Sequence, residues 1–151
     1  MMAVLLAPHF ADVDFARLAK ICIVHDPGEI VGDDIPAPDQ ARRRAADSSA
    51  TKSGDKRRDL PTLVAPLPPE TALEIVALWD EYEAAVTPEA RLTKALDKLE
   101  TILEHTQAEN PVGCAYRYNL GYGRECIAGY PVTVALRTAL HAETERRTHN
   151  E

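Results

Sequence analysis

The sequence predicts an all-α protein. Several segments show the hydrophobic period of an amphipathic helix, and no segment alternates apolar and polar residues as a half-buried strand does. Helix start signals precede these segments, and proline and glycine separate them. The chain has 151 residues, of which 45% are hydrophobic, so it is long enough for one domain with a buried core.

Two helices are predicted near the start of the chain. The first covers residues 2–7 and ends at Pro8. The second runs from about Phe15 to Asp26, with Asp14 as its N-cap. Its residues 18–24 are apolar nearly all the way round, so we expect this helix to be buried.

Residues 38–59 are predicted to form a mobile surface loop, because residues 41–59 contain no apolar residue larger than alanine. Order is expected to resume near Leu60. Two interpretations of the loop remain open: a solvated insertion, or a basic lid over an anionic substrate. The lid would use Arg42, Arg43, Arg44, Lys56, Arg57 and Arg58.

Three longer helices are predicted in the second half of the chain. The first covers about 70–85 and the last about 131–147. The middle one begins at the start signal at 87–89 and reaches His105. Residues 110–130 predict loops. The apolar stripe of the first of these helices is Leu73 or Ala72, then Ile75, Val76, Trp79 and Tyr82. The stripe of the next is Leu92, Ala95, Leu96, Leu99, Ile102 and Leu103.

Charge and hydropathy limit the partners and the compartment. The formal net charge is −7, which argues against nucleic acid or an anionic membrane as the main partner, although a small phosphate ester is compatible with it. No apolar stretch is long enough to span a membrane, and the start of the chain has no basic region of a signal peptide. We therefore expect a cytoplasmic protein.

The polar end of the second predicted helix holds the best functional clue. His25 and Asp26 stand side by side there, followed by Glu29, and such groups are seldom buried without partners. They suggest a metal site or an acid/base site, with a plain helix C-terminus as the alternative. Asp97 falls on the side of its helix away from the leucine stripe, so periodicity alone predicts a solvated carboxylate.

Five motifs occur in an order that is known from one family. They are His25-Asp26-x-Gly28-Glu29, Gly32-x-Asp34-Ile35-Pro36, Leu78-Trp79-x-Glu81-Tyr82-Glu83, Leu96-Asp97-Lys98-Leu99-Glu100 and Asn119-Leu120-Gly121-Tyr122-Gly123. On these motifs the chain resembles the HD-domain phosphohydrolases, in particular their 5′-deoxynucleotidase-like branch. The resemblance covers most of the chain outside residues 38–59.

The resemblance implies an all-α bundle that holds a divalent metal ion, Mn²⁺, Co²⁺ or Mg²⁺. The ligands that it implies are His25, Asp26 and Asp97, which for Asp97 replaces the expectation from periodicity. It places the catalytic glutamate at Glu29 and a second acid at Asp34, with neighbouring Asp33 as the alternative. The implied reaction is hydrolysis of deoxynucleoside 5′-monophosphates or similar small phosphate monoesters.

The chain also departs from the family pattern. The family's first ligand, a histidine, would stand before Met1, so we expect a bundle that lacks most of its first helix and an impaired enzyme. The resulting groove would favour association of two copies into a homodimer. Pro27 follows the His-Asp pair, and Pro61 lies where the family has a helix, which we expect to be broken or to start later. The alternative is a catalytically inactive module that binds nucleotide or a protein partner.

Overall fold

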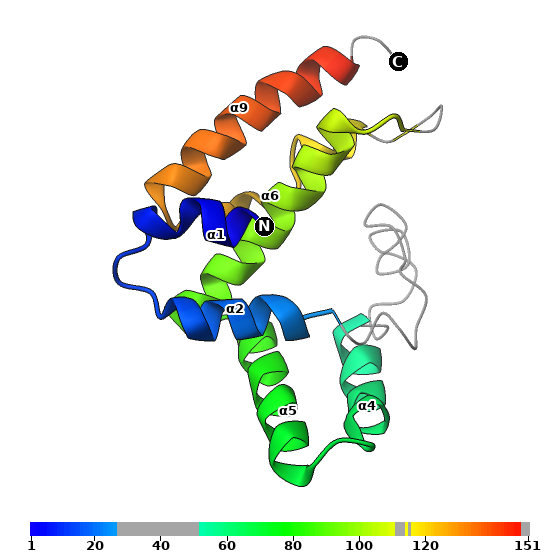
Figure 1. Ribbon diagram of the computed structural model, residues 1–151. Coiled ribbons are helices and arrows are strands. Elements are labelled where there is room, and N and C mark those ends of the chain that lie inside the picture. The colour runs from blue at the N-terminus through cyan, green and yellow to red at the C-terminus, as the bar shows by residue number, and fades with distance from the viewer. Residues whose placement is uncertain (27–51, 111–113, 115, 149–151) are drawn as a thin grey trace. The chain divides into compact units, whose positions relative to one another are not determined.

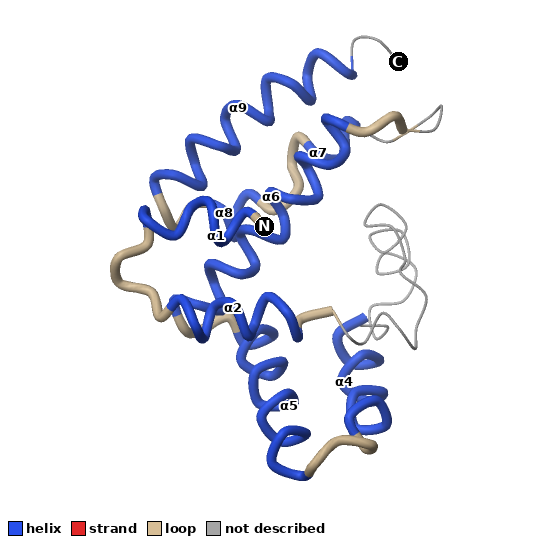
Figure 2. Tube along the Cα trace, viewed as in Figure 1, coloured by secondary structure: helices blue, strands red, loops and turns tan. Residues whose placement is uncertain are grey.

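The computed structural model describes residues 1–26, 52–110, 114 and 116–148, with residues 52–56 described by their backbone alone. All regular structure in this part of the chain is helical, which confirms the all-α prediction (Figure 2). The elements are α1 (Met2–Leu6), a 3-10 turn η1 (Ala7–His9), α2 (Phe15–Val24), α4 (Lys52–Val64), α5 (Pro69–Ala84), α6 (Pro88–Gln107), α7 (Tyr116–Asn119), α8 (Arg124–Ile127) and α9 (Pro131–Thr148).

The chain divides into two compact units. The first comprises residues 1–18 and 85–151, and the second comprises residues 19–84. The boundary falls inside α2, so this helix contributes its first residues to one unit and its last residues to the other. We describe each unit by itself.

The first unit is built on the long helix α6, against which α1, α8 and α9 pack (Figure 1). Its core cluster consists of Ala95, Leu99, Ile102 and Ile127. Leu92 and Leu96 of the same helix are also buried. The apolar stripe that periodicity predicts for this helix is therefore confirmed, apart from its last residue, Leu103, which is half-buried.

Both predicted N-caps are confirmed. The Thr87 hydroxyl oxygen accepts the backbone N–H of Ala90 at 3.2 Å, at the start of α6. Asp14 Oδ1 accepts the N–H groups two and three positions further on, at 2.9 and 3.1 Å, at the start of α2. The backbone N–H of Asp14 donates in turn to Oε1 of the buried Glu89, at 2.9 Å. This bond ties the start of α2 to the first turn of α6.

In the second unit α4 packs against α5, and here the sequence prediction was wrong in part. Residues 52–59 of the predicted loop are helical and belong to α4. Residues 38–51 of that loop lie outside the described residues. The helix continues because it carries Leu60 and Val64 into a core cluster with Trp79. Arg57 adds an ion pair to Asp80 of α5, with Nε and Oδ1 2.6 Å apart.

Pro61 lies inside α4 and does not break it, contrary to expectation. Its ring removes one backbone donor from the helix, which is normally destabilising. Here the residues on either side of it compensate, because Leu60 is fully buried and Val64 is 8% exposed. Apolar burial of these two side chains offsets the loss of one hydrogen bond.

The expectations for α2 and for residues 110–130 also need correction. α2 is buried on one face only, since Leu18 and Ile21 are fully buried but Ile23 is 80% exposed. The helix ends at Val24, before the His-Asp pair. Residues 110–130 contain the short helices α7 and α8 besides loops. Of the two alternatives for the start of the α5 stripe, Ala72 packs against the core cluster, whereas Leu73 is 71% exposed.

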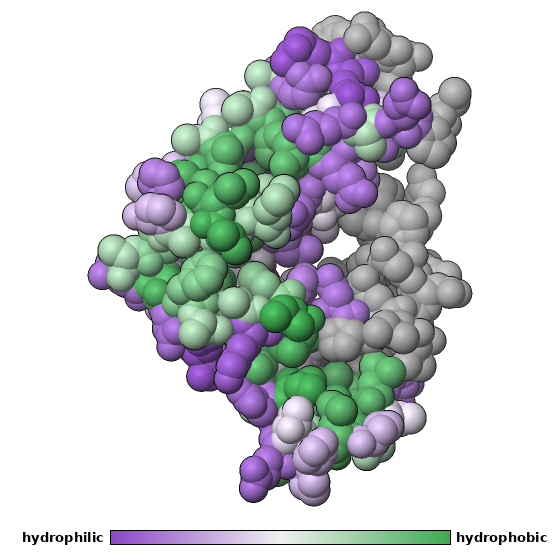
Figure 3. All heavy atoms as spheres, in the orientation of Figure 1, coloured by the Kyte–Doolittle hydropathy of each residue, from purple (hydrophilic) through white to green (hydrophobic). Residues whose placement is uncertain are grey.

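Apolar side chains also lie on the surface of the first unit. Hydrophobic residues gather over α1 and the adjoining part of α9 in the space-filling view (Figure 3), and Val4 and Leu5 of α1 are 66% and 68% exposed. In the described part of the chain, no helix combines the length and hydropathy that crossing a bilayer requires.

The substitution Leu99→Ala tests whether the α6 stripe carries the stability of the first unit. We expect it to lower the free energy of unfolding by about 2–5 kcal/mol, because it leaves a cavity in the core. Leu5→Ala is the matched control on an exposed position and should change it by less than about 0.5 kcal/mol. Urea denaturation followed by circular dichroism measures both, and equal effects would contradict the assignment of the core.

Candidate metal centre

His25 follows the last residue of α2 and has a fixed orientation. Its Nδ1 lies 2.8 Å from the carbonyl oxygen of Cys22, one turn earlier. Its ring packs against Tyr82 of α5, with centroids 5.1 Å apart. A carbonyl only accepts hydrogen bonds, so Nδ1 carries the hydrogen and Nε2 carries the lone pair of the neutral ring.

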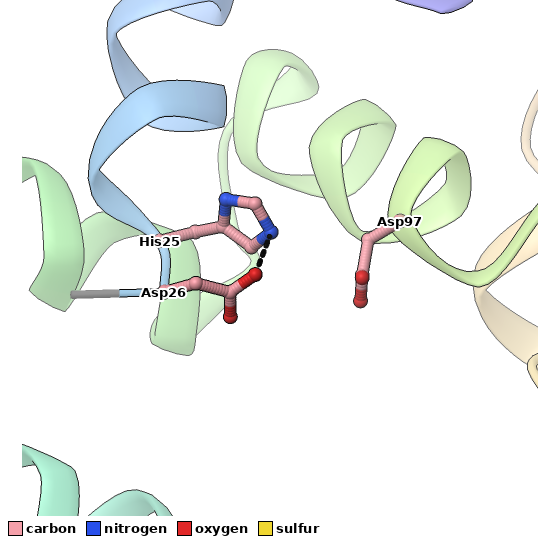
Figure 4. Close-up of side chains that lie close together, drawn as sticks. All are labelled: His25, Asp26 and Asp97. Atoms are coloured by element: carbon pink, nitrogen blue, oxygen red, sulfur yellow. Dashed lines mark ion pairs between the residues drawn. The ribbon is translucent and has the colours of Figure 1, made fainter. Parts of the chain in front are cut away.

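Asp26 faces the other ring nitrogen of His25. Its Oδ2 lies 2.9 Å from Nε2 (Figure 4), and the two side chains are 50% and 16% exposed respectively. A lone pair and a carboxylate oxygen at this distance repel each other unless a positive charge is shared between them. Either a proton on Nε2 or a metal ion bound by both groups supplies that charge.

Asp97 lies on α6 and is also drawn in Figure 4. Its side chain is 22% exposed, so it is not the fully solvated carboxylate that periodicity predicts. Other members of the same helix face differ: Thr93 is buried, whereas Glu100 is exposed. The backbone carbonyl of Asp97 accepts the hydroxyl of Thr101 at 3.0 Å, one turn further along α6.

Lys98 provides a cation beside Asp97. Its Nζ lies 2.7 Å from Asp97 Oδ2 and 5.1 Å from the centroid of the Tyr122 ring. Burial acts to lower the pKa of Lys98, but the charge and hydrogen bond of Asp97, together with Tyr122, outweigh it and raise that pKa above its ordinary value. Lys98 is therefore a cation at neutral pH.

The segment 119–123 packs against this ion pair. Gly123 has a φ of +69°, and a Cβ added to it would lie 2.6 Å from Lys98 Cβ and 2.8 Å from Lys98 Cγ. Asn119, which is 2% exposed, donates from Nδ2 to His105 Nδ1 of α6 at 2.8 Å. Both contacts hold the segment on α6.

Arg137 of α9 fixes the same segment from the other side. Its guanidinium donates to the carbonyl oxygens of Asn119, Leu120 and Tyr122 at 2.7, 2.9 and 2.5 Å. Burial first, and then the nearby Arg124, lower the pKa of Arg137. An arginine whose charge is held by backbone carbonyls orders the peptide that supplies them.

The described residues include some of the site residues that the sequence predicts and not others. His25 and Asp26 belong to the second unit, where the structure brings them together, and Asp97 belongs to the first. Glu29 and Asp34, with its alternative Asp33, lie outside the described residues. Of the predicted basic lid, Arg57 pairs with Asp80, and Arg42, Arg43 and Arg44 lie outside the described residues.

Comparison with known proteins decides the family. A model of the HD domain matches residues 1–125. The chain belongs to the HD-domain family. Zebrafish (Danio rerio) 5′-deoxynucleotidase HDDC2 is 35% identical over 102 residues, which cover 67% of this chain and 48% of that protein. The Xenopus laevis protein of the same name is 34% identical over 94 residues, 62% of this chain and 43% of that protein. The chain thus spans about half the length of these curated relatives.

A solved structure extends the likeness to nearly the whole HD-domain chain. A protein from Magnetospirillum magnetotacticum, described as a predicted metal-dependent phosphohydrolase, matches with a TM-score of 0.72 and 30% identity. The match covers 97% of this chain and 75% of that one. Membership of the HD family and this likeness together imply a divalent metal.

The residues at the end of α2 fit such an ion. The bond of His25 Nδ1 to a backbone carbonyl leaves Nε2 as the ring atom that could bind an ion, and such a bond is the usual support of a metal-binding histidine. Asp26 adds a carboxylate oxygen at 2.9 Å from that nitrogen. An imidazole with carboxylates suits a hard or borderline divalent cation.

The residues that contact or support the ion pair of Asp97 and Lys98 have no clear signal in the sequence. Lys98 lies inside the motif 96–100, but the spacing of residues in that motif does not indicate the contact between Lys98 and Gly123. Arg137 lies in α9, and its burial depends on carbonyls that are distant in the sequence. The glycines of 119–123 were the available signal, since one of them has a left-handed backbone.

Gly123→Ala tests the close approach of this segment to Lys98. We expect a loss of at least about 1–2 kcal/mol in the free energy of unfolding, from the left-handed backbone and from the clash with the lysine stem. Gly121→Ala is the matched control, because a Cβ there meets nothing within 4 Å. Urea denaturation compares the two variants, and a Gly123 variant as stable as the Gly121 variant would refute the described packing.

Proposed function

We propose that this HD domain is a metal-dependent phosphohydrolase that acts on deoxynucleoside 5′-monophosphates or similar small phosphate monoesters. The observation that carries the proposal is the pair of His25 Nε2 and Asp26 Oδ2, which lie 2.9 Å apart and so could bind one ion together. Family membership supports a phosphohydrolase. The relatives from Danio rerio and Xenopus laevis are 5′-deoxynucleotidases, which supports a deoxynucleotide substrate.

The proposed ligands of the metal ion are His25, Asp26 and Asp97, the residues that the family resemblance implies, and one imidazole with two carboxylates suits a divalent cation. The bond from Nδ1 of His25 to the Cys22 carbonyl would keep Nε2 directed at the ion. Both carboxylates would contribute negative charge to offset that of the cation. When bound, a divalent ion offsets the charge of a phosphate group and lowers the pKa of coordinated water.

The reaction needs two proton transfers, for which we propose Glu29 and Asp34. Glu29 would take a proton from the attacking water as its oxygen forms a bond to phosphorus. The bond from phosphorus to the 5′-oxygen then breaks, and Asp34 would give that oxygen a proton, so that a nucleoside and inorganic phosphate are released. Two carboxylic acids with these opposite tasks need different protonation states at the same pH.

A small substrate also agrees with the charge of the chain. A net charge of −7 disfavours a polyanion, for which every added phosphate increases the repulsion. A monoester brings a single phosphate group, and a divalent ion in the site would offset part of its charge. The proposal therefore concerns monomeric nucleotides and similar small phosphate monoesters.

Phosphate release from a panel of deoxynucleoside monophosphates, with Mn²⁺, Co²⁺ or Mg²⁺ added, tests the function. We expect EDTA to abolish release. Asp26→Asn and Asp97→Asn should each lower kcat/KM by more than about 100-fold, beyond the range typical for residues that only support a ligand. Glu100→Gln is the control, an exposed carboxylate one turn from Asp97 on the same helix, and should leave the rate unchanged.

Folded, metal-loaded protein that releases no phosphate from any of these substrates would refute the proposed hydrolase and favour a binding module.

A further inference from the structure

We propose that Lys98 is a positioning residue for Asp97: its ammonium group holds one carboxylate oxygen, so that the other is presented as the ligand atom. This inference rests on the proposed function, because it assigns Asp97 to the metal ion. It adds to that function a residue which would not touch the ion or the substrate. It follows from how Lys98 is held within the first unit.

The contact between Lys98 and Asp97 is not one that a helix provides by itself. Neighbouring positions on a helix differ by about 100° and do not face each other. Nevertheless Lys98 Nζ lies 2.7 Å from Asp97 Oδ2, and the two side chains are 26% and 22% exposed. Something outside α6 must therefore direct the lysine side chain toward its neighbour.

Gly123 and Tyr122 supply that direction. Gly123 lies so close to the lysine stem that any Cβ would come within 2.6 Å of Lys98 Cβ. The Tyr122 ring then receives the ammonium group at 5.1 Å from its centroid, a cation–π distance. The stem and the charged end of Lys98 are thus both fixed by two successive residues.

The support of these two residues reaches into the core of the unit. Arg137 donates to the Tyr122 carbonyl at 2.5 Å and is itself only 9% exposed. The bond between Asn119 and His105 ties the start of the same segment back to α6. A connected series of contacts therefore runs from α9 through the segment 119–123 to Lys98 and Asp97.

Packing alone does not explain a lysine at this position. A half-buried cation next to a metal ligand repels the metal ion, and an apolar side chain of the same length would fill the space against Gly123 without that cost. The ammonium group gives something that an apolar side chain cannot: a hydrogen bond to one defined oxygen of Asp97. Partners of this kind typically contribute about 10–100-fold to metal affinity.

Metal binding by the full chain tests the inference. Lys98→Met keeps an unbranched stem against Gly123 and removes the ammonium group. We expect calorimetric titration with Mn²⁺ to show affinity about 10–100-fold weaker than in the wild type. The visible absorption of bound Co²⁺ should also change, because the carboxylate is no longer fixed, and Lys98→Arg should recover part of both. Lys20→Met, which removes the same charge from an exposed ion pair with Glu74, should change neither.

The outcomes separate this inference from the proposed function. A wild-type chain that binds none of Mn²⁺, Co²⁺ and Mg²⁺ would overturn both. A wild type that binds the ion, with Lys98→Met binding it equally or more tightly, would overturn the positioning role alone. Circular dichroism checks that the variants are folded. If Lys98→Met fails to fold, Lys98→Gln replaces it, because glutamine retains part of the stem without the ammonium group. Unchanged metal affinity of Lys98→Gln would then overturn the positioning role.

Discussion

The structure of the first unit depends on one constraint, that a single helix must bury one side and expose functional groups on the adjoining side. On α6 the buried side holds Leu99 and Ile102, which α8 and α9 cover. Asp97 and Lys98 lie at the edge of that side, neither in the core nor in open solvent. At this edge the ion pair is screened less than on an open surface, and a hydrogen bond to the carboxylate gains in strength.

Periodicity and capping chemistry predicted most of the helical framework. The α6 stripe and the caps at Asp14 and Thr87 are local properties, so the sequence around them determines them. The stretch 52–59 was mispredicted because its composition has no apolar residue to indicate a helix. What extends the helix lies further along the chain, where Leu60 and Val64 pack against Trp79. Tertiary packing of this kind overrides local propensity.

The candidate site was predictable to the extent that residue types in a fixed order indicate a chemistry. His25, Asp26 and Asp97 stand out in that way. Their supporting contacts do not, because these join residues that are far apart in the chain. Lys98 meets Gly123, and the segment around Gly123 is held by Arg137. No local pattern contains such a contact, and only the fold reveals that a surface-looking lysine is held in place.

The position of Trp79 has a spectroscopic consequence. It is the only tryptophan of the chain, it is 2% exposed, and it lies in the core cluster of the second unit. Its indole N–H has no hydrogen-bond acceptor among the described residues, so its surroundings there are essentially apolar. Selectively excited fluorescence therefore reports on residues 19–84, whereas far-ultraviolet ellipticity reports on helices of both units. A difference between the two melting curves would measure how independently the halves of this small protein unfold.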